Sequence, residues 1–164
     1  MKNLPLTLLT LTVLFTATLS AQTTLQLSAS ERQSTFLLED GVAIQGYDPV
    51  SYFEGKPTKG KKDITTTYEG VTYRFASEAN KQTFLASPAK YEPAYGGWCA
   101  WAMAESGDKV EIDPRSYKIV EGRLFLFYNG FWANTRKQWQ AEAKKGKEAQ
   151  LLHQADQNWA DAVK

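Results

Sequence analysis

The sequence predicts an α+β fold: two short antiparallel β-hairpins, each followed by a helix, and a C-terminal amphipathic helix, all in one compact domain. Two segments of alternating apolar residues are each interrupted by a Glu-Gly pair and followed by a helix-capping residue. Near the C-terminus, Leu151, Leu152, Ala155 and Trp159 recur at helical spacing. The length of 164 residues is usual for a single domain.

The first hairpin is expected over residues 65–75, with Glu69-Gly70 as its turn. Ser77 is the expected N-cap of a helix that runs to about Ala86, where the following proline ends it. The inner face of this helix is expected to contain Ala79, Thr83 and Phe84.

The second hairpin is expected over residues 117–128, with Glu121-Gly122 as its turn. Both faces of its second strand are apolar, which is typical of a central strand. Asn134 is the expected cap of a helix that carries Trp139. The similarity of the two segments suggests two related hairpin–helix units with the cysteine stretch between them; the alternative is that any two hairpins with Glu-Gly turns look alike.

The stretch between the hairpins contains Cys99, the only cysteine, preceded by Tyr95, Gly96, Gly97 and Trp98. Its tryptophans, together with Phe127, are expected in the core. If the residues from Trp98 onward are helical, Cys99 and Met103 lie on one helix face and offer two soft sulfur ligands to Cu(I). The alternative is ordinary core packing, since free cysteine and methionine are both common inside proteins.

His153, the only histidine, falls beside the apolar stripe of the last helix. It is a third candidate metal ligand if that helix folds back over the Gly-Gly stretch. Otherwise it is an ordinary surface residue.

Residues 1–21 have the features of an export signal: Lys2, an apolar run from Leu4 to Phe15, and a small-residue exit at Ser20-Ala21. The run is short for a membrane span, so no stable span is expected after cleavage, although a retained anchor is the alternative. Residues 22–35 are polar and are expected to be a flexible lead. The folded domain is therefore expected over residues 36–164, in an exported protein that is periplasmic or secreted.

The charge balance is close to neutral, with 19 basic and 18 acidic residues. This offers no electrostatic footprint for nucleic acid, and the sequence identifies no protein partner. The sequence contains no glycine-rich phosphate loop, no CxxC pair and no HxxxH pair. The expectation is a non-enzymatic protein, with no catalytic residue and with copper as the one candidate cofactor.

Three runs of sequence carry a resemblance to a known family: GYDPVSYFEGKPTKG, the segment from YEGVTYRF to GGWCAWAM, and DPRSYKIVEGRLFLFYN. Over roughly residues 40–140 the chain resembles the exported bacterial YHS-domain proteins. YHS domains are similar to the TRASH group of treble-clef-like modules found in copper- and heavy-metal-handling proteins. The resemblance implies a hairpin followed by a helix and a metal role, with Tyr47, Asp48 and the run Tyr95 to Trp98 as motif residues.

The chain departs from the metal-binding relatives at three positions where they carry cysteine, here Ser51, Ser77 and Ala79. A zinc site of four cysteine or histidine ligands cannot be built from those places. Three hypotheses follow. The first is a non-enzymatic YHS-type module that binds copper through Cys99, the second a structural or protein-interaction domain with a buried, inert cysteine, and the third a thiol redox protein.

Overall fold

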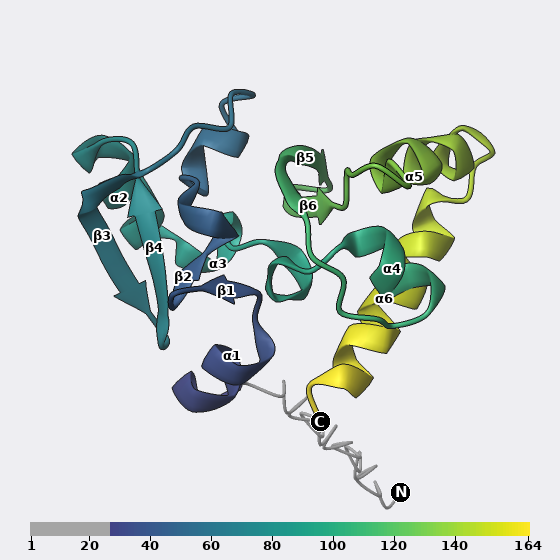
Figure 1. Cartoon of the computed structure of the whole chain (residues 1–164), viewed down its shortest axis with the longest axis horizontal. Coiled ribbons are helices and arrows are strands. Elements are labelled where there is room, and N and C mark those ends of the chain that lie inside the picture. The colour runs from purple at the N-terminus through teal and green to yellow at the C-terminus, as the bar shows by residue number, and fades with distance from the viewer. Residues whose placement is uncertain (1–26) are drawn as a thin grey trace, which may run out of the picture.

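The computed structural model describes residues 27–164, and its elements are drawn in Figure 1. The helices are α1 (Ala29–Thr35), α2 (Glu78–Ala86), α3 (Pro88–Tyr91), α4 (Ala100–Glu105), α5 (Thr135–Lys144) and α6 (Glu148–Ala162). The strands are β1 (Leu38–Glu39), β2 (Val42–Ala43), β3 (Lys61–Tyr68), β4 (Val71–Phe75), β5 (Asp113–Val120) and β6 (Arg123–Phe127). Three short 3-10 turns complete the list: η1 (Ile44–Gly46), η2 (Val50–Tyr52) and η3 (Ala94–Gly97). The predicted α+β class is confirmed.

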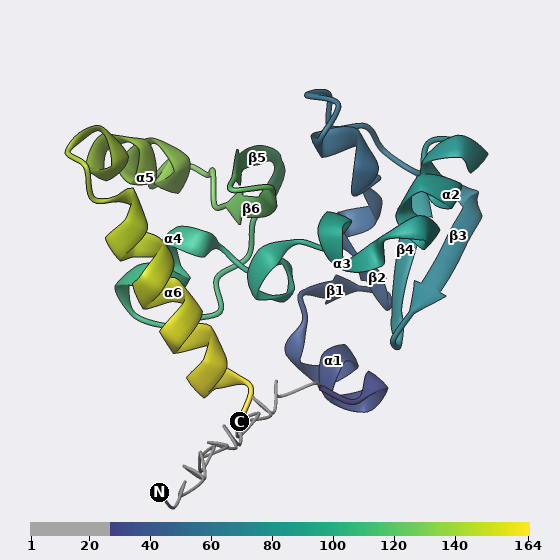
Figure 2. The ribbon, with the colours of Figure 1, turned by 180° about the vertical axis from the view of Figure 1, so that it is seen from behind.

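The first half of the chain forms a four-stranded mixed sheet in the order β1-β2-β4-β3. Strands β3 and β4 form the predicted hairpin, and β2 adds to β4 in parallel. Glu69 and Gly70 both have positive φ, 45° and 85°, as a tight two-residue hairpin turn requires. Figures 1 and 2 show α2 beside this sheet and α4, α5 and α6 gathered at the other end of the molecule.

The second hairpin, β5–β6, forms a separate two-stranded sheet. The free edge of β6 is covered by isolated parallel bridges from Pro93 to Leu124 and from Cys99 to Leu126. Strand β6 therefore has backbone partners on both sides and is buried on both faces. This explains the apolar pattern that predicted a central strand.

The two hairpins share their irregularities as well as their turns. The strand register shifts between Lys61 and Thr65 in the first hairpin and between Asp113 and Tyr117 in the second. Each shift lies at the same distance from its Glu-Gly turn. A β-bulge at matching positions is a specific feature, since a generic hairpin has no need of one. The two hairpins are thus built alike in detail.

Both helices that follow the hairpins begin as predicted. Ser77 accepts a hydrogen bond from the Asn80 amide, and Asn134 accepts one from the Lys137 amide. The predicted inner face of α2 is wrong in part, because Ala79 and Thr83 are exposed and only Phe84 is buried. With one large aromatic ring facing the sheet, this short helix does not need a wide apolar stripe.

The segment expected to be a flexible lead, residues 22–35, contains helix α1, so its last seven residues are helical. Ser28 and Glu31 form a capping box at the start of this helix. Arg32 is buried and forms ion pairs with Glu92 and Glu69, while its guanidinium lies 4.4 Å from the centre of the Phe36 ring. The expectation of a flexible lead followed the polar composition and did not use the capping box. This helix is held in place by Arg32, by the Gln33 side-chain amide that donates to the Gly70 carbonyl, and by the Thr35 carbonyl that accepts from Trp98. The predicted signal peptide, residues 1–21, and residues 22–26 lie outside the described residues.

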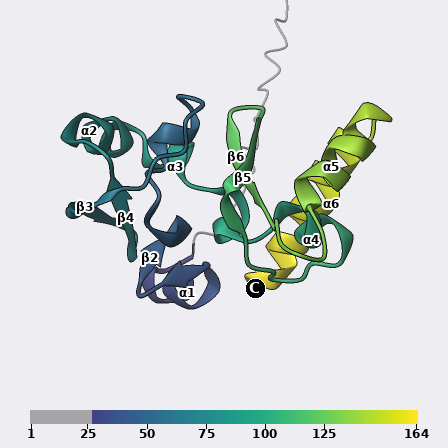
Figure 3. The same cartoon turned by 45° about the horizontal axis from the view of Figure 1, so that its top comes forward.

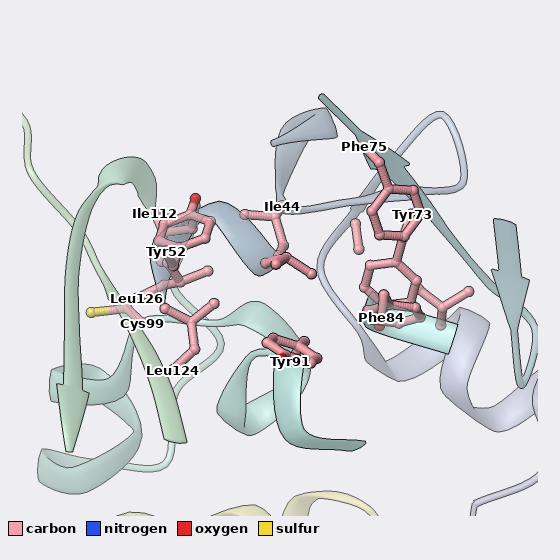
Figure 4. Packing of buried hydrophobic residues seen from close by; sticks show 13 residues of the cluster. Ile44, Tyr52, Tyr73, Phe75, Phe84, Tyr91, Cys99, Ile112, Leu124 and Leu126 are labelled. Carbon is pink, nitrogen blue, oxygen red and sulfur yellow. The ribbon is translucent and has the colours of Figure 1, made fainter. Parts of the chain in front are cut away.

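The core contains two clusters that meet at β6. Leu124 and Leu126 belong to the cluster under the first sheet, part of which is shown in Figure 4, and Phe125 and Phe127 belong to the cluster under α5 and α6. Alternate residues of one strand thus pack into different clusters. Phe127 is fully buried as predicted, whereas Trp98 and Trp101 are only partly buried, which corrects their expected core positions.

Helix α6 lies across the second half of the molecule, beside α4 and α5 (Figures 1 and 3). Its apolar face buries Leu151, Leu152 and Ala155, which confirms the predicted amphipathic helix. Polar contacts fix its position: Arg123 pairs with Asp156, Asn158 donates to the Met103 carbonyl, and Trp139 donates to Glu148. Among residues 27–164, no helix has the length and apolar content that a bilayer crossing requires.

Gly96 lies where the N-terminal segment and α6 converge. Its φ is +60°, and a Cβ atom there would lie 2.8 Å from Cδ1 of Phe36 and 3.0 Å from Cη2 of Trp159. Its carbonyl accepts a hydrogen bond of 2.9 Å from the Leu37 amide. A side chain at this position would therefore push apart two segments that are distant in sequence.

We predict that Gly96→Ala destabilises the protein more than Gly122→Ala. Both glycines have positive φ, which costs an alanine roughly 1–2 kcal/mol. A Cβ atom at Gly122 meets nothing within 4 Å, so only Gly96→Ala adds an overpacking cost of about 1–3 kcal/mol. Chemical denaturation of both variants measures the difference, and equal losses would contradict the close approach at Gly96.

Candidate functional site

Asp48 is a completely buried acid that joins two parts of the first unit. Its Oδ1 accepts from the Val50 amide at 2.9 Å, and its Oδ2 accepts from the Ala76 amide at 2.9 Å and from Asn80 Nδ2 at 2.7 Å. One carboxyl group thus accepts the amide of the first residue of η2, satisfies the amide that follows β4 and holds the first turn of α2. A buried group with these partners is a structural anchor.

Cys99 is also completely buried, with 0% of its surface exposed. Its Sγ accepts a hydrogen bond from the Tyr128 amide at 3.4 Å and lies 3.4 Å from Thr135 Oγ1. The Thr135 hydroxyl donates to the Tyr128 carbonyl at 2.9 Å, which uses its single proton. At the contact between Cys99 and Thr135 the thiol S–H is therefore the donor. These bonds form a closed ring that a neutral thiol satisfies.

The loops that carry Asp48 and Cys99 have the same backbone path. Three consecutive residues with positive φ precede each one: Ile44, Gln45 and Gly46 in the first loop, and Tyr95, Gly96 and Gly97 in the second. The Asp48 amide donates to the Thr58 carbonyl, and the Cys99 amide donates to the Val110 carbonyl, both at 2.9 Å. Such runs of left-handed residues are uncommon outside glycine, so their recurrence marks the two loops as equivalent.

The anchoring bonds are equivalent too. Ala76 is the first residue after β4 and donates its amide to Asp48, while Tyr128 is the first residue after β6 and donates its amide to Cys99. The parallel bridge between Val42 and Thr72 has its counterpart between Pro93 and Leu124. Cys99 therefore occupies in the second unit the place that Asp48 occupies in the first.

This equivalence supports and corrects the prediction of two related units. The cysteine stretch does not lie between them; it is the opening loop of the second unit, as Ile44–Gly46 and the residues after it open the first. The sequences of the two loops share little beyond one glycine and an aromatic residue before the anchor. The likeness of the two loops therefore lies in their backbone conformation and not in their sequence.

The structure does not bring Cys99 and Met103 together as a pair of metal ligands. Cys99 is the N-cap of α4, with φ −60° and ψ 116°, so the assumption that it begins a helical face is wrong. Cys99 packs in the cluster with Leu126, and Met103 packs in the cluster with Phe127. Leu126 and Phe127 are on alternate faces of β6, so the two sulfur-bearing side chains belong to different sides of that strand.

His153 is exposed on α6 and takes no part in the surroundings of Cys99. Among the described residues, no group of three or more His, Cys, Asp or Glu side chains has the arrangement to hold a metal ion. In Figure 4 the sulfur of Cys99 lies on the side of the cluster far from Tyr73 and Phe84. Of the three predicted ligands, Cys99 and Met103 are buried in different core clusters and His153 is exposed on α6.

The other motif residues form a structural hub. Tyr95 donates its hydroxyl to Asp156 of α6 at 3.0 Å, and burial, followed by the charge of Asp156, raises the pKa of Tyr95. Trp98 donates Nε1 to the Thr35 carbonyl at 2.7 Å. Tyr47 forms an isolated antiparallel β-bridge with Lys59. The ammonium group of Lys59 lies 5.2 Å from the centre of the Tyr47 ring. These residues join α6, the end of α1 and the loop after η2 to the two anchor loops.

Sequence reasoning missed the partners of both anchors. Asn80 was not considered, although a polar residue at the third position of a short helix beside a buried acid was a usable signal. Thr135 lies 36 residues from Cys99, and no local pattern in the sequence indicates this contact. The contact between Arg32 and Glu92 is long-range and leaves no pattern in the sequence.

Comparison with known protein families identifies a YHS domain over residues 49–95. This match begins immediately after Asp48, covers the first hairpin and α2, and ends at Tyr95. It stops before Cys99 and before the whole second hairpin, so the match carries no statement about the cysteine. Searches of curated proteins and of solved structures find no match to the chain.

We predict that the two anchors contribute unequally to stability. Cys99→Ala leaves the Tyr128 amide without its acceptor and is expected to cost about 1–3 kcal/mol, whereas Cys99→Ser keeps an acceptor and a donor and is expected to cost less. Asp48→Ala leaves three donors unsatisfied and is expected to cost at least about 3 kcal/mol. Urea denaturation measures all three, with the exposed Asp63→Ala as a control that should change little. A Cys99→Ala loss no larger than that of the control would show that Cys99 is no anchor.

Proposed function

We propose that this chain is an exported, non-enzymatic YHS-type module that acts by binding a partner surface, and that Cys99 is a structural anchor within it. The observation that carries the proposal is the equivalence of Cys99 and Asp48. Each group accepts the amide that follows its hairpin, and both residues are completely buried. The role of the cysteine is thereby explained without a ligand.

A Cu(I) site at Cys99 requires the thiolate form of this residue and a second soft ligand. The hydrogen bonds around Cys99 are satisfied by a protonated thiol, and Met103 lies in the other core cluster. The reactive cysteine of a thiol enzyme or redox protein requires an activating base and an exposed sulfur atom. The neighbours of Cys99 are a backbone amide and a threonine hydroxyl, neither of which is a base. The anchoring role fits these contacts better than either alternative.

Export is part of the proposal because of the sequence alone. The charge at Lys2, the apolar run after it and the small residues Ser20-Ala21 are the three features of a cleavable signal. Ser28 caps the first helix, so cleavage near residue 21 would leave the folded part intact.

We predict that Cys99 reacts with a small thiol reagent only after the protein is unfolded, because its sulfur is fully buried. We also predict that a competition titration with Cu(I) gives equally weak binding in the wild type, Cys99→Ser and Met103→Leu. The urea-unfolded wild type serves as the positive control for thiol labelling. Stoichiometric Cu(I) binding that disappears in Cys99→Ser would overturn the anchoring role and restore the metal hypothesis.

We predict a mature N-terminus at about Gln22. Intact-mass measurement of the protein isolated from the periplasm or the medium tests this, with the unprocessed chain from a cell-free synthesis as the mass standard. A membrane-bound product with the mass of residues 1–164 would show a retained anchor and contradict cleavage.

A further inference from the structure

Two adjacent aromatic side chains project from the loop between β6 and α5. Phe131 is 90% exposed and Trp132 is 86% exposed, and their ring centres are 5.0 Å apart in an edge-to-face arrangement. The other large apolar side chains that are exposed among residues 27–164, Leu85 and Val110, are only 43% and 36% exposed. A pair of neighbouring exposed rings is an apolar patch that a soluble surface has no reason to keep unless it binds something.

Hydrogen bonds connect the two sides of the loop that carries the rings. The Gly130 amide donates to the Ala133 carbonyl at 3.0 Å, and Asn134 Nδ2 donates to Asn129 Oδ1 at 2.8 Å. At the base, the Thr135 amide donates to the Tyr128 carbonyl at 3.0 Å. The rings are therefore presented on a preorganised support, so that little loop entropy is lost when they bind.

The same loop belongs to the Cys99 anchor, because Tyr128 and Thr135 are the two partners of that thiol. The first unit has no such projection: α2 begins three residues after β4, whereas α5 begins eight residues after β6. The aromatic loop is thus what the second unit adds to the shared architecture, and the anchor at its base holds it in place.

The loop and the first turn of α5 carry basic but no acidic residues, and Asp113 on β5 accepts a hydrogen bond from Asn129 at the base of the loop. The sequence has no acidic residue between Glu121 and Glu142, and the first turn of α5 carries Arg136 and Lys137. No described carboxylate lies within ion-pair distance of either side chain. The Nε of Arg136 is buried and has no hydrogen-bond partner within residues 27–164. The buried Nε is out of reach of an external anion. Lys137 is exposed, so its ammonium group is the basic group beside the loop that is open to one.

From these observations we infer that the Phe131–Trp132 loop inserts into the interfacial layer of an anionic lipid bilayer, with the exposed Lys137 against the lipid phosphates. Small molecules and extended peptides bind in concave sites and grooves, whereas these rings project outward. Tryptophan next to a second apolar ring suits the boundary between headgroups and acyl chains, and an exposed basic group beside it adds attraction to an anionic surface. The occupant that matches the shape, the polarity and the charge together is a membrane surface.

The test uses the full chain and vesicles of phosphatidylcholine with 30–40% phosphatidylglycerol (roughly a third anionic lipid, enough to create a negative surface), compared with pure phosphatidylcholine vesicles. Co-sedimentation is expected for the wild type with the anionic vesicles and to decrease by at least about tenfold in Phe131→Ser/Trp132→Ser. Leu85→Ser/Val110→Ser removes two exposed apolar side chains elsewhere and is expected to bind like the wild type. Lys137→Gln is expected to weaken the preference for anionic vesicles, while Lys62→Gln, at an exposed position on β3, is expected to keep it.

Quenching by lipids brominated along the acyl chain separates insertion of the loop from any binding through residues 1–26. The fluorescence of Trp132, obtained as the difference between the wild type and Trp132→Phe, is expected to be quenched. Equal quenching of the wild type and Trp132→Phe, or vesicle binding that Phe131→Ser/Trp132→Ser leaves unchanged, overturns the inference, as does the absence of binding to anionic vesicles. Circular dichroism confirms that each variant is folded.

This inference gives the partner surface of the proposed module its chemistry, and it rests on that proposal. The two fail separately. A reactive or copper-binding Cys99 removes the structural role of the thiol and leaves vesicle binding unaffected, whereas loss of vesicle binding leaves Cys99 a buried anchor.

Discussion

The fold depends on one recurring constraint: the backbone amide that follows each hairpin must find a buried acceptor. The amide of Ala76 and the amide of Tyr128 both point into the protein at the place where a strand ends and a helix is about to begin. Both hydrogen bonds are partly buried, and leaving such an amide unsatisfied would cost more than a typical hydrogen bond contributes. Each opening loop supplies the acceptor, from Asp48 in one unit and from Cys99 in the other.

A carboxyl group and a thiol solve this problem differently. Asp48 has two oxygens and accepts three hydrogen bonds, so it also fixes the first turn of α2 through Asn80. The thiol of Cys99 accepts one hydrogen bond and donates one, and the threonine at the start of α5 completes the ring. The connection between strand and helix is longer in the second unit, and it contains the aromatic loop.

The units are held together by packing around the run Tyr95 to Trp98. Phe36 and Trp159 approach Gly96 from opposite ends of the chain, and only a residue without a side chain allows both to do so. Burial, followed by the charge of Glu92, raises the pKa of Tyr73, and the same Glu92 holds Arg32 of α1. Helices α1 and α6 therefore pack against the core and are integral parts of the fold.

Local chemistry in the sequence was enough to predict the two hairpins, their Glu-Gly turns, the caps Ser77 and Asn134 and the amphipathic last helix, because these features depend on neighbours a few residues away. The start of helix α1 has a local signal in the capping box of Ser28 and Glu31, whereas its attachment to the core through Arg32, Glu69 and Glu92 joins residues that are distant in the sequence. The environment of Cys99 could not be predicted for a related reason. Whether its sulfur meets Met103, His153 or the Tyr128 amide is decided by how β6 packs against the opening loop, and residues that far apart in the chain are brought together only by the tertiary structure.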